Sequence, residues 1–400
     1  MLATCDYYVP AYRAGGTVRT MEAMVALLGD ELQFRILTRD RDLGSQPYTG
    51  IKRGVWEKVG AAEVMYLPPQ DLTPSRLRRL ITATSHDVLY LNSLFSVPFS
   101  AYPLALRRLG LVEERCVIIA PRGEVAPGAL QLKRLKKATY IALSRRLGLY
   151  EDVLWQASSR HELEQIRATL GHRCQILVAS DLSLARSPQS GKASRLSKEP
   201  GSLRAFFLGR ISRTKNLDGA LAIISVIRGH VEFTIYGPIE DRQYWRECQT
   251  LISQLPPNIT VRYAGEVSPD HVPVAMASHH LLFLPTLGEN YGHVILEALS
   301  VGCPVLISDR TPWRHLQNLG VGWDVSLDQP GEFQRILNEC VAMDSVHWGE
   351  LSDAAAAYAA RSRRDPEAQE RNRALFYNCL DRAQTTARVK RMNGTYRSRD

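Results

Sequence analysis

The chain has 400 residues, of which 45% are hydrophobic and 23% are charged, and its formal net charge is +9 at pH 7. This length and composition allow two globular domains with full cores. No apolar run approaches the roughly 20 residues of a membrane-spanning helix, and the N-terminus lacks the pattern of an export signal. The positive charge predicts an acidic partner: nucleic acid, anionic lipid or a polyphosphate-bearing substrate.

Seven cysteines, at positions 5, 116, 174, 248, 303, 340 and 379, are scattered along the chain and form no CxxC pair. An odd, scattered set argues against a disulfide framework and against a zinc site. It is typical of a protein that stays in a reducing cytosol. We therefore expect a cytoplasmic protein without a metal centre.

Short apolar runs alternate with amphipathic segments along the first half of the chain. This alternation predicts βαβ units on a parallel sheet, with a very short first strand before Asp6. The predicted strands are Gln33–Thr38, Ala62–Leu67, Asp87–Leu91, Cys116–Ala120, Asp152–Ala157 and Gln175–Ala179. The predicted helices are Thr17–Leu28, Pro74–Thr84, Pro98–Leu109 and Leu130–Leu147.

Residues 184–202 are rich in Ser, Gly, Pro and Lys without a hydrophobic period, which indicates a linker or an exposed loop. The alternation then resumes, with predicted strands at Arg204–Leu208, Val231–Tyr236, Ile259–Tyr263, Leu281–Leu284 and Pro304–Ile307. Beyond Gly331 the pattern is helical, and the basic end, Ala387–Asp400, is expected to fray. We predict two Rossmann-like α/β domains, 1–183 and 203–365, facing a central cleft, and a C-terminal helix and basic tail at 366–400.

The first stretch that carries chemistry follows the strand predicted to end at Leu208. Gly209 frees the backbone, and Arg210 and Lys215 lie five positions apart (215 − 210) in one loop, before Asn216 as the predicted N-cap. A guanidinium and an ammonium group in one loop can converge on a diphosphate. Taken alone, the segment fits a solvated basic turn equally well.

The second stretch runs from Leu287 to Val305. The Gly-containing loop LGENYG leads into a helix whose N-terminal N–H groups and dipole favour an anion. Glu289 in the loop and Glu297 in the early helix lie eight positions apart (297 − 289) and can face one pocket. Carboxylates near an anion site are suited to accept hydrogen bonds from sugar hydroxyls. The two stretches together predict a sugar-nucleotide site.

With Gly302-Cys303-Pro304-Val305, these stretches resemble the GT-B-fold retaining glycosyltransferases of family 4, which include sucrose synthase. The resemblance covers nearly the whole chain. Segments similar to the bacterial O-antigen and exopolysaccharide branch are Tyr7-Tyr8-Val9-Pro10 with Gly15-Gly16, Thr38-Arg39-Asp40-Arg41-Asp42 and Pro121-Arg122-Gly123-Glu124.

The resemblance implies a retaining, metal-independent hexosyltransferase whose UDP- or GDP-linked sugar donor is a substrate, with no further cofactor. Arg210 and Lys215 would hold the donor diphosphate, Glu289 the donor sugar hydroxyls and Glu297 the ribose. Gly16 would bring backbone N–H groups to the donor phosphate across the cleft. The other residues implied to contact the nucleotide sugar are Gly15, Gly209, Tyr263, Gly265, Asn290, Tyr291 and Gly292.

One position departs from the family pattern. Many relatives carry a His after the fourth N-terminal strand, where this chain has Asn92. An amide cannot act as a general base, so Asn92 would instead bind the sugar or the acceptor by a hydrogen bond. The leaving diphosphate oxygen would then take the acceptor proton. With Asn92, the resemblance assigns Arg122 and Glu124 to the acceptor, a glycan or a polyprenyl-diphosphate-linked sugar.

Two other patterns point to different chemistry, and a third pattern is missing. Asp40-Arg41-Asp42 is a D-x-D, which in another glycosyltransferase fold binds a divalent metal, but no third ligand is identifiable nearby. Glu289 and Glu297 match the residue types of a glycosidase pair, yet that reaction has no use for the basic loop. No GxGxxG follows a predicted strand, which leaves a nicotinamide site without support.

A basic helix is predicted near 131–137. Lys133, Arg134, Lys136 and Lys137 can lie against anionic lipid or simply face solvent. We expect peripheral contact with the inner face of the membrane, because acceptors in the branch that the chain resembles are usually lipid-linked. Nucleic-acid binding lacks a recognisable motif.

The sequence thus predicts transfer of a sugar from a nucleotide donor to a surface-polysaccharide acceptor. Two alternatives stay open. A sugar-nucleotide 2-epimerase of the same double-Rossmann architecture would need no acceptor, and a non-catalytic sugar-nucleotide-binding protein would show no turnover.

Overall fold

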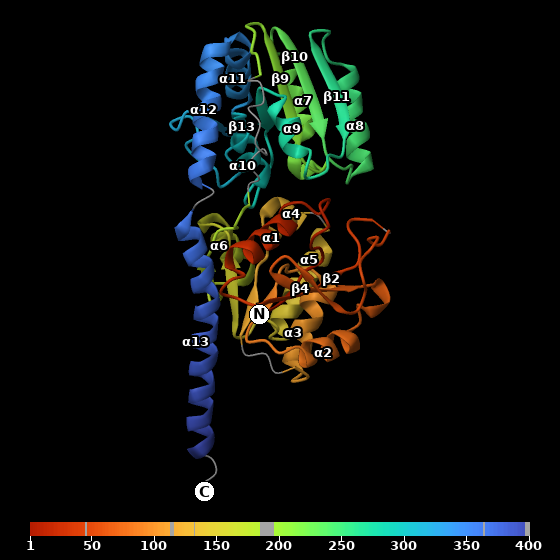
Figure 1. The fold of residues 1–400 in the computed structure, drawn as a ribbon, viewed down its shortest axis with the longest axis vertical. Coiled ribbons are helices and arrows are strands. Elements are labelled where there is room, and N and C mark those ends of the chain that lie inside the picture. The colour runs from red at the N-terminus through yellow and green to blue at the C-terminus, as the bar shows by residue number, and fades with distance from the viewer. Residues whose placement is uncertain (45, 113–115, 132, 185–195, 363–364, 397–400) are drawn as a thin grey trace. The chain divides into compact units, whose positions relative to one another are not determined.

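The computed structural model describes residues 1–44, 46–112, 116–131, 133–184, 196–362 and 365–396. The chain forms two compact units, Met1–Ser183 with Pro366–Asp400 and Leu184–Asp365 (Figure 1). Each unit is a largely parallel sheet covered by helices, which confirms the predicted α/β class. Within the described ranges, no helix is both long and apolar enough to cross a bilayer.

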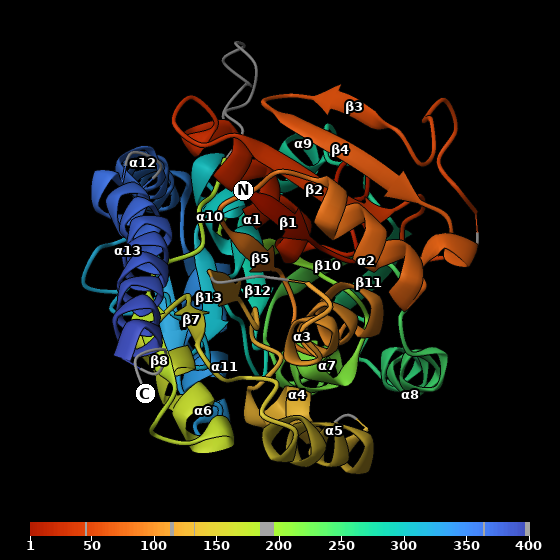
Figure 2. The ribbon, with the colours of Figure 1, turned by 90° about the horizontal axis from the view of Figure 1, so that it is seen from below.

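The sheet of the N-terminal unit has the strand order β3-β4-β2-β1-β5-β6-β7-β8 in the part of the chain that the structure describes. Its strands are β1 (Leu2–Thr4), β2 (Phe34–Arg39), β3 (Trp56–Val59), β4 (Ala62–Leu67), β5 (Leu89–Leu91), β6 (Val117–Ile119), β7 (Val153–Ala157) and β8 (Gln175–Val178). β3, at the edge of the sheet, pairs antiparallel with β4 (Figure 2). The sequence analysis missed this strand.

Alternate residues of these strands enter two separate cores. Ala3 and Ile36 pack on one face with α1 (Gly16–Leu28) and α13 (Pro366–Tyr396). Leu2 and Leu37 pack on the other face with α2 (Pro74–Ala83), α3 (Tyr102–Arg108) and α6 (Arg160–Leu170). Because both faces are covered, inner strands such as β5 (LYL) and β6 (VII) are buried at every residue. The remaining helical segments of this unit are η1 (Pro69–Asp71), η2 (Val97–Ala101), α4 (Pro127–Gln131) and α5 (Arg134–Arg146).

Two predicted helices of this unit are divided. The segment expected at 98–109 begins as the π-helical turn η2 and continues as α3. The segment expected at 130–147 is split between α4 and α5, with Lys133 in the left-handed conformation (φ 57°) at the start of α5.

The sheet of the C-terminal unit has the order β11-β10-β9-β12-β13-β14 among the described residues. Its strands are β9 (Ser202–Leu208), β10 (His230–Tyr236), β11 (Ile259–Gly265), β12 (Leu281–Leu284), β13 (Val305–Ser308) and β14 (Gly322–Val325). Its helical segments are η3 (Arg213–Lys215), α7 (Leu217–Ile224), α8 (Arg242–Ser253), α9 (Val272–Ala277), α10 (His293–Ser300), α11 (Pro330–Ala342) and α12 (Ser345–Ser362). All neighbouring strands are parallel, and only β14 was not predicted.

Residues 185–195 of the predicted linker lie outside the described residues, and its last part is largely exposed except for Lys198. The Lys198 side chain is 1% exposed. Its ammonium group donates to the carbonyl oxygen of the neighbouring Glu199 (2.9 Å). It also donates to the carbonyl oxygens of Val341 (3.2 Å) and Met343 (2.9 Å) at the end of α11. Burial lowers the pKa of Lys198. Lys198 therefore attaches this part of the segment to the C-terminal unit.

The C-terminal helix belongs to the N-terminal unit. α13 extends to Tyr396 and so includes most of the tail that was predicted to fray, and 397–400 lie outside the described residues. The Asn372 side chain, wholly buried, donates to the Ser180 carbonyl oxygen at 2.8 Å. The Phe376 ring packs 5.8 Å from the ring of Tyr90 on β5.

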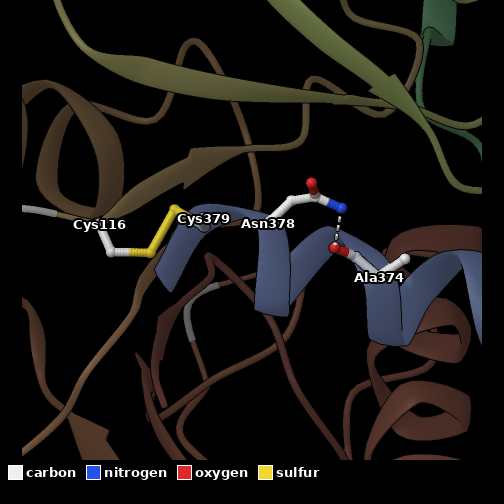
Figure 3. The surroundings of a disulfide bond; sticks show 4 residues. All are labelled: Cys116, Ala374, Asn378 and Cys379. Carbon is white, nitrogen blue, oxygen red and sulfur yellow. Dashed lines mark hydrogen bonds between the residues drawn. A yellow bond between two sulfur atoms is a disulfide. The ribbon is translucent and has the colours of Figure 1, made fainter. Parts of the chain in front are cut away.

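A disulfide bond joins Cys116, directly before β6, to Cys379 on α13 (Figure 3). The two residues are 263 positions apart, with their Cα atoms 5.5 Å from each other. The scattered spacing of the cysteines argued against disulfides, and this pair contradicts it. Spacing along the sequence carries no information about cysteines that the fold brings together from distant segments.

Candidate functional site

The loops that carry the two predicted stretches flank one point of the C-terminal sheet. The chain passes from β9 to β10 on one side of β9 and later returns to β12 on the other side. Ligands of open α/β sheets bind beyond the strand carboxyl ends at such a switch point. The loop after β9 contains the basic stretch and the loop after β12 contains the acidic stretch.

An ion pair joins these two loops. The ammonium group of Lys215 contacts the carboxylate of Glu289, and their side chains are 17% and 11% exposed. The Lys215 methylene chain passes over Gly209, where an added Cβ would meet it at 3.7 Å. That separation is an ordinary van der Waals contact, so the lysine chain packs against Gly209 on its way to Glu289. The structure thus brings together Gly209, Lys215 and Glu289.

Backbone atoms also connect the loops. The Leu287 N–H donates to the Thr214 carbonyl oxygen at 2.9 Å, and the Thr286 hydroxyl donates to the same oxygen at 3.0 Å. Asn216 occupies the predicted N-cap position of α7 in the left-handed conformation (φ 57°). Its amide donates to the Pro285 carbonyl oxygen at 2.7 Å and forms no capping bond. The side chain therefore joins the two loops where capping was expected.

Arg210 lies on the same edge but has a different partner. Its guanidinium donates from Nη1 to Glu240 Oε1, at 2.9 Å, in the loop after β10. The two side chains are 38% and 45% exposed. An exposed pair of this kind contributes little to stability, about 0–1 kcal/mol. Arg210 is therefore not committed to a structural role by this contact.

The loop after β12 enters α10 as the sequence predicted. Gly292 precedes the helix with φ 80°, and an added Cβ there would lie 2.8 Å from Ile295 Cδ1. The indole N–H of Trp313 donates to the carbonyl oxygen of Tyr291, which holds the turn in place. Asn290 and Tyr291 lie in this turn, partly exposed. Glu297 lies in the second turn of α10 and is half-buried.

Tyr263 and Gly265 lie at the end of β11, on the same edge. The Tyr263 hydroxyl donates to the Gly237 carbonyl oxygen at 2.9 Å, and its ring is 37% exposed. The ring of Trp245 on α8 packs 4.8 Å from it. Trp245 was not predicted, because its position in a polar helix carries no signal of a neighbour on β11. Gly265 has φ 78° at an irregularity in the β10–β11 pairing.

In the N-terminal unit the corresponding switch point lies between β1 and β5. The Gly15-Gly16 turn, with Gly15 at φ 78°, starts α1 without a side-chain cap. Asp42 accepts hydrogen bonds from the N–H groups of Tyr12 (2.8 Å) and Arg13 (2.9 Å), so it fixes the loop that leads to this turn.

The rest of the D-x-D is used internally. Asp40 is 2% exposed and pairs with Arg41 (2.7 Å) and Arg53 (2.9 Å). In the described ranges, no group of three or more His, Cys, Asp or Glu side chains could hold a metal ion.

The three residues assigned to the acceptor form internal contacts. The Arg122 guanidinium, 3% exposed, contacts the Asp181 carboxylate and donates to Asn92 Oδ1 at 2.9 Å. Glu124 accepts from the Ser93 hydroxyl at 2.8 Å, and burial raises its pKa. The sequence placed these residues correctly at the ends of β5 and β6 but gave no sign of their burial.

The basic helix near 131–137 presents a mixed surface. Lys133, Arg134 and Lys136 are exposed, and Leu135 between them is 83% exposed. Lys137 points inward instead. Its ammonium group donates to the Ala129 carbonyl oxygen at 2.8 Å and lies 4.7 Å from the Phe95 ring centroid, and burial lowers its pKa.

Comparison with protein families matches the C-terminal part of the chain. Residues 192–357 match the family model described as glycosyl transferases group 1. No curated protein matches the chain.

Solved structures match over nearly its full length. Sucrose-phosphate synthase from Thermosynechococcus elongatus superposes with a TM-score of 0.64 at 15% identity, covering 99% of both chains. HepE from Anabaena, in complex with UDP and glucose, gives a TM-score of 0.64 at 14% identity, covering 98% of this chain and 99% of that one. WaaG, a glycosyltransferase involved in lipopolysaccharide biosynthesis, gives 0.62 at 15% identity, covering 94% and 98%. The chain therefore has the GT-B fold of these proteins, and residues 192–357 match the group 1 glycosyl transferases.

Proposed function

We propose that the protein is a retaining glycosyltransferase of family 4 that moves a sugar from a UDP- or GDP-linked donor to a lipid-linked surface-polysaccharide acceptor, as in O-antigen assembly. The observation that carries this proposal is the contact between Lys215 and Glu289 at the switch point of the C-terminal sheet. In this contact Lys215, a cation that can bind a diphosphate, lies beside Glu289, a carboxylate that can accept hydrogen bonds from sugar hydroxyls. Both residues are in the part of the chain that matches the group 1 family model.

The reaction needs no general base in the protein. The bond between the anomeric carbon and the diphosphate oxygen breaks, and the acceptor hydroxyl oxygen bonds to that carbon on the same face. The hydroxyl proton passes to the leaving diphosphate oxygen. Arg210 and Lys215 stabilise the charge that develops on the diphosphate, each contributing about 2–4 kcal/mol. Glu289 orients the sugar and Glu297 the ribose.

The first prediction is that Lys215→Ala and Glu297→Ala each lower kcat/KM for transfer by about 100-fold or more, because each removes a contact to the donor in the transition state. Transfer is measured with a nucleotide sugar chosen by thermal-shift screening of UDP-, GDP- and ADP-sugars. NMR of the product's anomeric centre reports retention.

Glu232→Ala is the matched control, because its side chain is 53% exposed on β10, away from the switch point. It should keep full activity. Full activity of both site variants would refute the proposal. Conversion of the donor without any acceptor would favour the 2-epimerase, and binding without turnover across a broad acceptor panel would favour a sugar-nucleotide-binding protein.

The proposal includes peripheral membrane contact through the start of α5, which a lipid-linked acceptor would require. We predict that the protein cosediments with vesicles containing phosphatidylglycerol and not with neutral vesicles, because each basic side chain near an anionic surface contributes about 1 kcal/mol. A double change of Arg134 and Lys136 to Glu should abolish cosedimentation. Arg335→Glu, an exposed basic position on α11, serves as the control. Equal binding of all three proteins would exclude this helix as the contact.

A further inference from the structure

Arg210, one of the two cations proposed to hold the donor diphosphate, faces a carboxylate that the sequence analysis did not consider. Glu240 comes from the loop after β10 and meets Arg210 at the same edge of the sheet. Both side chains are more than one-third exposed, so solvent and solutes reach the pair. Because Arg210 is proposed to hold the diphosphate, a bound donor would meet this pair.

The backbone holds the two segments together. The Ile211 N–H donates to the Pro238 carbonyl oxygen at 2.9 Å, and the Glu240 N–H lies 3.3 Å from the Ile211 carbonyl oxygen. Gly237 allows this approach, because its φ is 129° and an added Cβ would lie 2.0 Å from the Gly209 carbonyl oxygen. The proximity of Arg210 and Glu240 thus follows from the β9–β10 pairing and does not depend on two flexible side chains meeting by chance.

The carboxylate occupies only part of the guanidinium. A guanidinium has five N–H donors, and Glu240 accepts from Nη1 alone. Among the residues that the structure describes, no other hydrogen bond to the Arg210 side chain is present. A diphosphate that approaches Arg210 therefore finds free donors but also a negative charge beside them, which repels it.

We propose that Glu240 sets the affinity of the protein for the donor diphosphate by competing with it for Arg210. This inference rests on the proposed function, because it takes Arg210 to bind the diphosphate. Glu240 acts through Arg210 and takes no part in the bond-breaking step. Its removal should change binding and leave the rate of the chemical step unchanged.

The test is Glu240→Gln in the full chain, which keeps the shape of the side chain and removes its charge. The dissociation constants of UDP and GDP are measured by calorimetry, and KM and kcat are measured with the donor. We expect binding to tighten by about two- to fivefold, the range that exposed ion pairs carry, with kcat unchanged. The gain should shrink between about 20 mM and about 300 mM salt, because exposed charges are screened.

Two controls isolate the pair. Glu247 on α8 pairs with Arg213, which lies in the same loop as Arg210; Arg213 Nη2 is 2.7 and 2.8 Å from the two Glu247 carboxylate oxygens. Glu247→Gln removes this carboxylate and should leave nucleotide affinity unchanged. In an Arg210→Ala background the competition is absent, so Glu240→Gln should tighten binding by a smaller factor that reflects only direct repulsion, and the difference between the two backgrounds measures the coupling.

The outcomes separate the inference from the proposed function. Weaker binding or a lower kcat in Glu240→Gln would show that Glu240 positions Arg210, and unchanged binding at all salt concentrations would show that it has no influence. Either result overturns the inference about Glu240. The proposed function still stands in that case, provided that the wild-type protein binds the nucleotide and transfers the sugar. A wild-type protein that neither binds a nucleoside diphosphate nor transfers a sugar overturns both.

Discussion

At the scale of single residues, His280 connects acidity to the stability of the C-terminal unit. It is 2% exposed, its Nδ1 accepts from the Arg204 N–H at 3.0 Å, and its Nε2 lies 3.0 Å from the Ser197 carbonyl oxygen. Both contacts suit the neutral ring with its proton on Nε2. Burial, with smaller effects from nearby Arg204 and Lys198, lowers the pKa of His280 from 6.5 to about 4.

The unfolded chain therefore takes up this proton at a higher pH than the folded chain. The contribution of His280 to stability is present in full above about pH 6.5 and is lost as the pH falls toward 4. We predict that the unfolding temperature of the C-terminal unit falls between pH 7 and pH 4.5. His280→Asn, which keeps an acceptor for the Arg204 N–H, should make this fall smaller. Differential scanning calorimetry across the pH range measures it.

His347 is the control for this prediction. It is exposed, and its hydrogen bond to Asp344 raises its pKa, so its own contribution has the opposite sign. His347→Asn should not flatten the profile. If His280→Asn retains the wild-type slope, other groups cause the acid sensitivity.

At the scale of elements, what the sequence predicted was decided by hydrophobic pattern. β12 is a continuous apolar run and β4 is apolar except for Glu63, and the bounds of both strands were predicted to the residue. β3, with the sequence WEKV, is a half-exposed edge strand without such a run. β14 starts at Gly322 and contains Asp324, which breaks the pattern. Edge elements are held by the sheet they join, and their own sequences show this poorly.

The residues of the site also divide into those that the sequence could predict and those that it could not. The loops with Lys215 and Glu289 were predictable, because each follows a buried strand and parallel strands end at one edge. The pairing of Arg210 with Glu240 was not, because it depends on the backbone geometry after β9 and β10. The burial of Asn92 and Arg122 was also hidden, since buried and exposed polar residues look alike in a sequence.

At the scale of the whole molecule, the chain does not divide into consecutive parts. It completes the C-terminal unit at Asp365 and then returns to the N-terminal unit as α13. The disulfide between Cys116 and Cys379 closes a loop that contains the entire C-terminal unit. The two sulfur atoms lie in the same core as β1, β2 and α1. The return of the chain is thus fixed by packing and by a covalent bond.

Reduction of this bond should therefore weaken the attachment of α13. In the chain-entropy model, closing a loop of this length restricts the unfolded chain by about 6 kcal/mol, which is an upper value because residual structure already restricts the unfolded chain. We predict that dithiothreitol lowers the unfolding temperature of the N-terminal unit and slows the migration of the denatured chain in a gel. Cys379→Ala should match the reduced wild type with or without reductant. Cys340→Ala, which removes a buried free cysteine of the other unit, should stay sensitive to reductant. A wild-type chain whose unfolding temperature and gel migration ignore dithiothreitol would show that packing alone holds α13 in place.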